Sequence, residues 1–149
     1  MRVLIQRVSE ASVTINETVH GAIDQGLLLL VGIEHDDNQQ DIEWLVKKIA
    51  QMRIFSDEEG KMNLSVQDIK GSALVISQFT LHASTKKGNR PSYIKAARPE
   101  VAIPLYEQFV KSLSAQNISV ETGEFGADMK VQLLNDGPVT IWLDSRDKQ

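Results

Sequence analysis

Two hydroxyl side chains and one histidine follow residues 73–76, an apolar run that is typical of a buried strand. Ser77 and Thr80 are candidate nucleophiles and His82 is a candidate base, because such a hydroxyl needs a base within hydrogen-bond reach. If the strand continues, Thr80 and His82 share a face but point in parallel rather than at each other. No acidic residue is near in sequence to orient the imidazole, although folding could bring one close. A covalent Thr/Ser esterase or peptidase that uses Thr80 is therefore one hypothesis.

The second candidate is the turn Asn135-Asp136-Gly137-Pro138, which precedes the last apolar segment. Asp-Gly is a hairpin signal, because glycine takes positive φ without steric cost. Pro138 removes a backbone donor and restricts φ to about −65°. It also gives the Gly137–Pro138 bond a chance of roughly 5–6% of being cis. Taken alone, the segment is typical of an ordinary turn, and it gains weight only beside the motif at residues 77–81.

Other kinds of site find little support. His20, His35 and His82 are isolated, with no second ligand at helical or strand spacing, so we expect no metal site. No glycine spacing matches a phosphate-binding loop, and no cofactor is expected. The chain has no cysteine, which excludes disulfides and thiolate chemistry.

Charge is unevenly distributed along the chain. There are 20 acidic and 16 basic residues and a net charge of −4, whereas nucleic-acid-binding proteins usually present a basic surface. Residues 83–99 nevertheless contain no acidic residue. On this stretch alone the plain interpretation is a solvated loop. Its five cations are Lys86, Lys87, Arg90, Lys95 and Arg98.

Length and periodicity predict one α+β domain over residues 1–149. Hydrophobic residues at helical spacing predict helices at about 38–52 and 100–116, the first capped by Asp36 or Asp37 and the second begun or kinked at Pro104. Residues 82–98 are expected to form a long irregular loop, which in compact domains is often functional. The expected strands are 2–8, 11–16, 18–24, 27–33, 53–55, 73–80, 118–123, 128–134 and 139–144.

Residues 27–31, the longest apolar run, are too short to cross a bilayer, and no signal peptide opens the sequence. We therefore expect a cytoplasmic protein with no membrane partner.

Seven segments follow one another in a recognisable order along nearly the whole chain: residues 1–8, 53–57, 60–63, 77–81, 90–92, 122–129 and 135–140. Together they resemble the D-aminoacyl-tRNA deacylase family. The resemblance implies a compact, barrel-like, mostly antiparallel sheet assembly with two packed helices that works as a homodimer. It implies hydrolysis of the ester of D-aminoacyl-tRNA, and of glycyl-tRNA mischarged on tRNA(Ala), with no metal or cofactor.

The family pattern also implies roles for single residues. The catalytic segment is Ser77, Gln78, Phe79 and Thr80, in which backbone N–H groups near Phe79 and Thr80 stabilise the oxyanion and the ribose 2′-hydroxyl of the RNA assists the attack. The pair Gly137 and Pro138, held by Arg7, would reach from one subunit into the site of the other and exclude an L side chain.

The tRNA would be held in two further places. Phe125 and Met129 are implied to contact the adenine, with core packing as the alternative for both. Lys86, Lys87 and Arg90 are expected to face the tRNA backbone. The resemblance assigns His82 no role. A non-catalytic module that binds the end of an RNA is the alternative to an enzyme.

Overall fold

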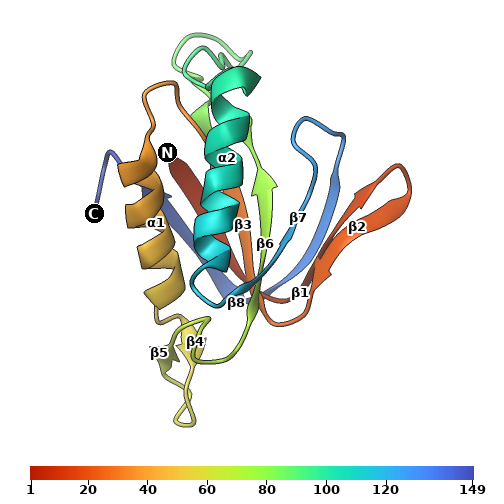
Figure 1. Ribbon diagram of the computed structural model, residues 1–149, viewed down its shortest axis with the longest axis vertical. Helices are drawn as coiled ribbons and strands as arrows, with labels where there is room; N and C mark the ends of the chain where they lie inside the picture. Colours follow the sequence, from red (N-terminus) through yellow and green to blue (C-terminus); the bar gives the residue numbers. More distant parts are fainter.

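The computed structural model describes residues 1–149 and shows a strongly bent sheet with two helices packed on one face (Figure 1). This confirms the predicted α+β, barrel-like architecture. In chain order the elements are β1 (Arg2–Ile15), β2 (Thr18–Ile23), β3 (Gly26–Gly32), α1 (Gln39–Gln51), β4 (Phe55–Ser56), β5 (Met62–Leu64), β6 (Ser72–Ser77), the 3-10 helix η1 (Phe79–His82), α2 (Pro99–Ser114), β7 (Ser119–Thr122) and β8 (Lys130–Asp144).

The main sheet has the order β2-β1-β3-β6-β7, and β8 also pairs with β1. The pairs that involve β1 are antiparallel, whereas β3 with β6 and β6 with β7 are parallel. Because β3 and β6 are covered on both faces, their sequences are almost continuously apolar. The sheet nearly closes where β2 approaches β7: His20 Nδ1 lies 3.0 Å from the Thr122 carbonyl oxygen.

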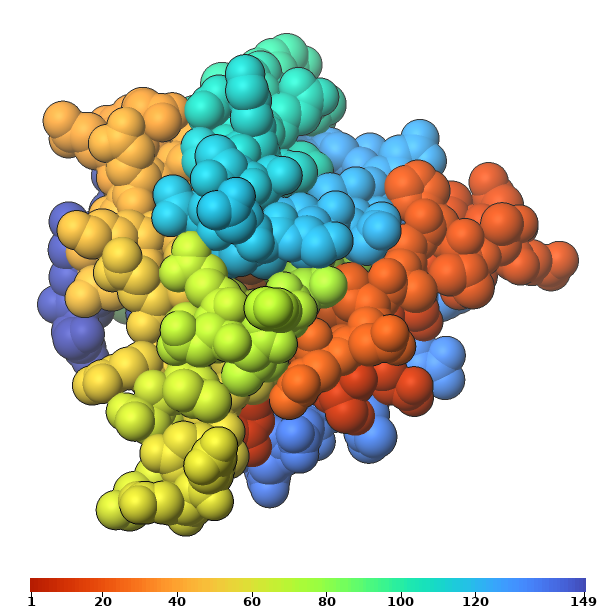
Figure 2. All heavy atoms as spheres, turned by 60° about the horizontal axis from the view of Figure 1, so that its bottom comes forward, coloured from red at the N-terminus to blue at the C-terminus, as the bar shows by residue number.

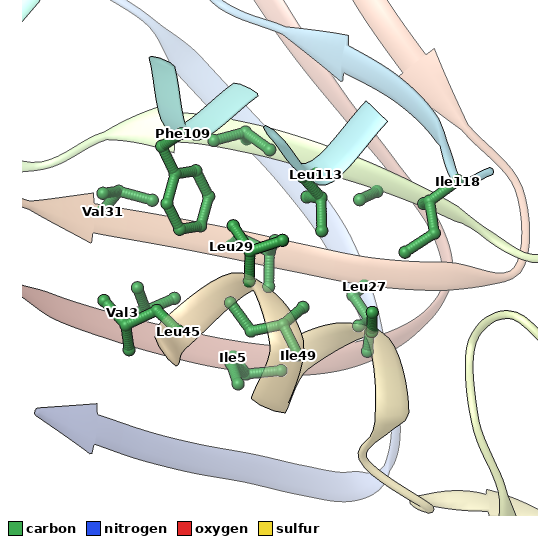
Figure 3. Close-up of a cluster of buried hydrophobic side chains, with 14 of the residues drawn as sticks. Val3, Ile5, Leu27, Leu29, Val31, Leu45, Ile49, Phe109, Leu113 and Ile118 are labelled. Atoms are coloured by element: carbon green, nitrogen blue, oxygen red, sulfur yellow. The ribbon is translucent and has the colours of Figure 1, made fainter. Parts of the chain in front are cut away.

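The main core lies between the helices and one face of the sheet. Figure 3 shows side chains of α1 and α2 meeting those of β1 and β3. Phe109 and Leu113 of α2 are fully buried, as are Leu45 and Ile49 of α1. These residues recur at helical spacing, which is why the sequence pattern located both helices. Their partners on the strands include Val3, Ile5, Leu27, Leu29 and Val31.

The helix ends differ from the expectation in two details. Asn38, not Asp36 or Asp37, caps α1: its side chain accepts a hydrogen bond from the Gln40 N–H at 2.9 Å. Asp37 is instead buried against the amino group of residue 1 at 2.7 Å. Helix α2 begins at Pro99 and continues through Pro104. Pro104 is exposed, so the Glu100 carbonyl that loses its partner there can be hydrated.

The strand boundaries also differ. β1 and β8 are each one long strand where two were expected, and bulges in the β1–β8 ladder bend them. β6 ends at Ser77, and η1 replaces the strand that was expected to reach residue 80. Short strands β4 and β5 form a separate hairpin, and in Figure 2 it projects from the body on a different side from the β1–β2 hairpin. No helix has both the length and the hydrophobicity that a membrane crossing requires.

Candidate active site

A cavity of about 330 Å³ opens where β3 and β6 end, beside the first turn of α2 and the β7–β8 connection. It contains five of the predicted site residues: Ser77, Gln78, Phe79, Phe125 and Met129. The structure thus joins two segments that are about 45 positions apart in the sequence. The rest of the lining is Val31, Ile33, Ile76, Ala97, Ala102, Gly126, Ala127, Asp128 and Val131.

The predicted catalytic segment forms the turn that leaves β6. The Gln78 N–H still donates to the Val31 carbonyl at 2.7 Å, and η1 begins at the next residue. The first hydrogen bond of η1 runs from the Leu81 N–H to the Gln78 carbonyl. The N–H groups of Phe79 and Thr80 therefore precede the first donor of the helix and have no partner within it. Thr80 itself does not line the cavity, and its Oγ1 accepts a hydrogen bond from the Gln78 side chain.

His82 does not act as a base toward Ser77 or Thr80 in this arrangement. His82 is 1% exposed, and neither ring nitrogen makes a hydrogen bond. Nδ1 lies 3.2 Å from Glu34 Oε1, but without hydrogen-bond geometry. The arrangement that a covalent mechanism would require is absent, because η1 turns the chain away from the strand direction assumed in the sequence.

Phe125 forms one wall of the cavity and packs against the core. Its ring centroid is 6.0 Å from that of Tyr106, whose hydroxyl donates to the Val75 carbonyl at 2.8 Å. Burial raises the pKa of Tyr106 to about 12, so this donor stays protonated at neutral pH. Phe125 and Met129 are both half-buried and pack partly against core clusters. Both side chains therefore pack against the core and also line the cavity.

The basic loop between η1 and α2 starts and ends close to the cavity. Ser84 and Ser92 pair across its base through hydrogen bonds of 2.8 and 2.9 Å, and the Ala97 N–H donates to the Ile33 carbonyl at 2.8 Å. All five of its cations are exposed, and none takes part in an ion pair. Lys86, Lys87 and Arg90 therefore present uncompensated positive charge beside the site.

The Gly137–Pro138 bond is cis, and Gly137 has φ +148°. Arg7 was expected to hold the carbonyls of this pair. Its Nε donates instead to the preceding carbonyl, that of Asp136, at 2.7 Å, and its Nη1 to the Ile54 carbonyl at 2.7 Å. Gly137 and Pro138 are themselves exposed.

The turn and the cavity lie at opposite ends of the sheet. Arg7 pairs with Leu27 near the start of β3, whereas Val31 and Ile33 at its end line the cavity. Leu27 and Val31 are separated by about 13 Å of strand, at roughly 3.3 Å per residue. The structure of one chain therefore does not bring Gly137, Pro138 and Arg7 to the other predicted residues.

Sequence reasoning missed Tyr93, whose ring meets that of Phe79 edge to face with 5.0 Å between centroids. No periodic pattern marks a loop residue that contacts another segment, and its aromatic type was the only available signal. No three His, Asp or Glu side chains lie close enough together to hold a metal ion.

Comparisons with known proteins agree with this architecture. The family model described as D-Tyr-tRNA(Tyr) deacylase matches residues 4–144. A D-aminoacyl-tRNA deacylase of Bacteroides fragilis (strain YCH46) is 65% identical over 150 residues, which cover 100% of both chains. A solved structure of a c-Myc DNA Unwinding Element Binding Protein is 40% identical, with a TM-score of 0.91 over 97% of this chain and 98% of that one. A probable eukaryotic D-amino acid tRNA deacylase shares the fold, at 16% identity and a TM-score of 0.81 over 95% and 97% of the two chains. The chain belongs to the D-Tyr-tRNA(Tyr) deacylase family.

Proposed function

We propose that the protein hydrolyses the ester bond of D-aminoacyl-tRNA and releases the D-amino acid and the tRNA. The observation that supports this most is the composition of the cavity. Asp128 is its only ionisable lining residue, and this side chain is exposed and paired with Lys130 at 3.1 Å. A site with no buried acid, base or activated nucleophile suits an ester that water can attack once its carbonyl is polarised.

The chemical step uses backbone donors. Water attacks the ester carbonyl carbon, and the negative charge that develops on its oxygen is stabilised by the N–H groups of Phe79 and Thr80. The bond to the ribose oxygen then breaks, and that oxygen takes the proton that the water gives up, with the neighbouring ribose 2′-hydroxyl assisting. The mostly apolar walls strengthen this stabilisation, because prearranged donors act more strongly where bulk water is excluded.

Binding of the tRNA end involves the two other predicted groups. Phe125 and Met129 offer an aromatic face and a polarisable sulfur to the terminal adenine. The cations Lys86, Lys87 and Arg90 face the phosphates that lead to it. A cavity of about 330 Å³ falls at the lower end of the usual range for ligand sites, about 300–1,000 Å³, so it suits the terminal adenosine rather than a longer RNA segment.

Selectivity for D over L requires a second copy of the chain. We place Gly137 and Pro138 of one subunit at the cavity of its partner, where their backbone would occupy the space of an L side chain. Two observations support a homodimer: the turn is exposed and distant from its own cavity, and β8 contains no fully buried residue. On β8, Leu134 is 58% and Trp142 is 47% exposed. Glycine has no side chain to exclude, so glycyl-tRNA mischarged on tRNA(Ala) is also a substrate in this proposal.

Cysteine crosslinking tests the cross-subunit arrangement directly, because the chain contains no cysteine of its own. One protein carries Asp136→Cys beside the turn and a second carries Asp128→Cys at the cavity. After subunits are mixed under mild oxidation, the proposal predicts a disulfide-linked mixed dimer. Glu17→Cys at the exposed tip of the β1–β2 hairpin replaces Asp136→Cys in the control. A monomer in sedimentation, or equal crosslinking by the control, would contradict the arrangement.

Release of D-tyrosine from D-tyrosyl-tRNA tests the activity. Ala127→Leu places a larger side chain in the cavity and should abolish release, whereas Ala22→Leu on the exposed side of β2 should not. No release by the wild type, or full release by Ala127→Leu, would contradict the proposal. Tight tRNA binding without turnover would favour the second candidate, a module that binds an RNA end, which the name of the nucleic-acid-binding structural relative makes worth testing. The cytoplasm, where aminoacyl-tRNA is used, is the proposed place of action.

A further inference from the structure

Phe79 and Tyr93 form an exposed aromatic pair beside the cavity, named here the aromatic shelf. Their ring planes are inclined at 77° with 5.0 Å between centroids. Phe79 is 54% exposed and Tyr93 is 38% exposed, so both rings keep much of their surface in water. Burial of a large aromatic side chain is energetically favourable, so exposed rings beside a site are typical of a ligand-binding surface. Because Phe79 also lines the cavity, the shelf is continuous with the proposed adenosine site.

The charge around the shelf restricts what can occupy it. Tyr93 belongs to the basic loop, residues 83–98, which carries five cations without ion pairs and no acidic residue. The one acid in the cavity lining, Asp128, is paired with Lys130. An occupant must therefore combine a flat apolar face with negative charge. A nucleotide in a single strand has both, since its base stacks on aromatic rings and its phosphate pairs with lysine or arginine.

We propose that the aromatic shelf binds the base of the nucleotide immediately before the terminal adenosine, with Tyr93 as the stacking residue. The inference rests on the function proposed above and extends the substrate site by one nucleotide. The strand would leave the cavity past Phe79, stack its second base on Tyr93 and continue along the cations of the loop. The edge-to-face contact with Phe79 fixes the Tyr93 ring, so that little side-chain entropy remains to be lost on binding.

Three substrates distinguish base stacking on Tyr93 from an effect on ester hydrolysis itself. They are D-tyrosyl-adenosine, the D-tyrosyl ester of the trinucleotide CCA, and D-tyrosyl-tRNA. Phe79 is left unchanged because it lines the cavity of the proposed catalytic centre. Tyr93→Leu removes the aromatic face, Tyr93→Phe keeps it, and Val19→Ala changes an exposed apolar residue on β2 as the control. The readout is kcat/KM for each substrate at fixed salt.

The proposal predicts that Tyr93→Leu lowers kcat/KM for the CCA and tRNA esters by about 5- to 100-fold, the range that stacking of one base supports. Hydrolysis of D-tyrosyl-adenosine should stay unchanged, and Tyr93→Phe and Val19→Ala should match the wild type on all three. Equal loss on all three substrates would show that Tyr93 acts only by holding Phe79, and no loss on any would show that it binds no base. Either result overturns the inference. If the wild type hydrolyses none of the esters, the proposed function itself has failed.

Discussion

The guanidinium of Arg7 binds the carbonyl of Asp136 at 2.7 Å and thereby fixes the chain immediately before Gly137. A second bond, from Nη1 to the Ile54 carbonyl, connects the same side chain to the segment that leads into β4. One planar donor group thus joins β1, the β8 turn and the β4 segment. Lysine would not reproduce this arrangement, because all three N–H donors of its ammonium lie on one nitrogen, whereas Arg7 uses two separate nitrogens.

Gly137→Ala tests whether this turn controls selectivity. An added methyl group would lie 2.8 Å from the Val139 backbone nitrogen and 3.1 Å from Arg7 Nη2, at a φ of +148° that L residues rarely adopt. The turn must therefore shift, and we expect the ratio of D- to L-tyrosyl-tRNA hydrolysis to fall at least tenfold. Gly60→Ala is the matched control, since Gly60 also has positive φ but nothing within 4 Å of the added atom. An unchanged ratio in Gly137→Ala would separate the turn from selectivity.

Thr80→Ala tests the backbone mechanism. The Thr80 hydroxyl accepts from Gln78 and does not line the cavity, while its N–H survives the substitution. The single-turnover rate on D-tyrosyl-tRNA should stay within about tenfold of the wild type, since removing a true nucleophile costs on the order of 10³-fold or more. A loss of that size would restore the covalent mechanism.

The unpaired lysines should set the salt dependence of tRNA binding. Replacing Lys86 and Lys87 by Gln should weaken binding and reduce the slope of log K against log salt by about 1.4 to 1.8, if each lysine contacts one phosphate. The same two replacements at Lys47 and Lys48 on α1 serve as the control of equal charge change. Equal slopes in the two double variants would place the RNA elsewhere.

Asp144 should contribute to acid stability. Burial alone would raise the pKa of Asp144, but hydrogen bonds from the Arg146 N–H and the Arg2 guanidinium outweigh it and lower that pKa below 3.8. A carboxyl whose pKa is lowered by folding stabilises the fold at pH above its pKa in the unfolded chain. This contribution is lost as the pH falls through its pKa in the folded protein. We would measure the free energy of unfolding in urea at pH values from 7 to about 2. Below about pH 4 it should decline less steeply in Asp144→Asn than in the wild type. The same pH profile in both proteins would contradict this role.

The sequence predicted the elements that local pattern controls. Helices α1 and α2 were located because their apolar residues repeat at helical spacing, and β3 and β6 because strands covered on both faces are continuously apolar. The structure differs from the prediction where contacts between distant residues determine the local conformation. Asp37 cannot cap α1 because the amino group of residue 1 binds it, so Asn38 takes that position. The apolar and polar alternation at 77–81 also fits a strand, yet the chain turns into η1.

The strand that contains Pro138 was also not predicted from local pattern. Proline normally ends a strand, and two strands were predicted around it. The ladder passes from the pair Gln6–Thr140 to the pair Val8–Asn135, so residues 136–139 lie outside it. Because no ladder hydrogen bond is required of Pro138, β8 continues through it. The grouping of Phe79 with Phe125 and Met129 followed from the family resemblance, since no local pattern reports that two distant segments share a cavity.

The most direct test of the central claim is the ratio of hydrolysis rates for D-tyrosyl-tRNA and L-tyrosyl-tRNA, measured at limiting enzyme and fixed salt on the same tRNA. The proposed site predicts loss of the D ester while the L ester stays intact. Loss of both esters would contradict the selectivity assigned to Gly137 and Pro138. Survival of both would contradict the enzyme itself and leave a protein that binds aminoacyl-tRNA without turnover.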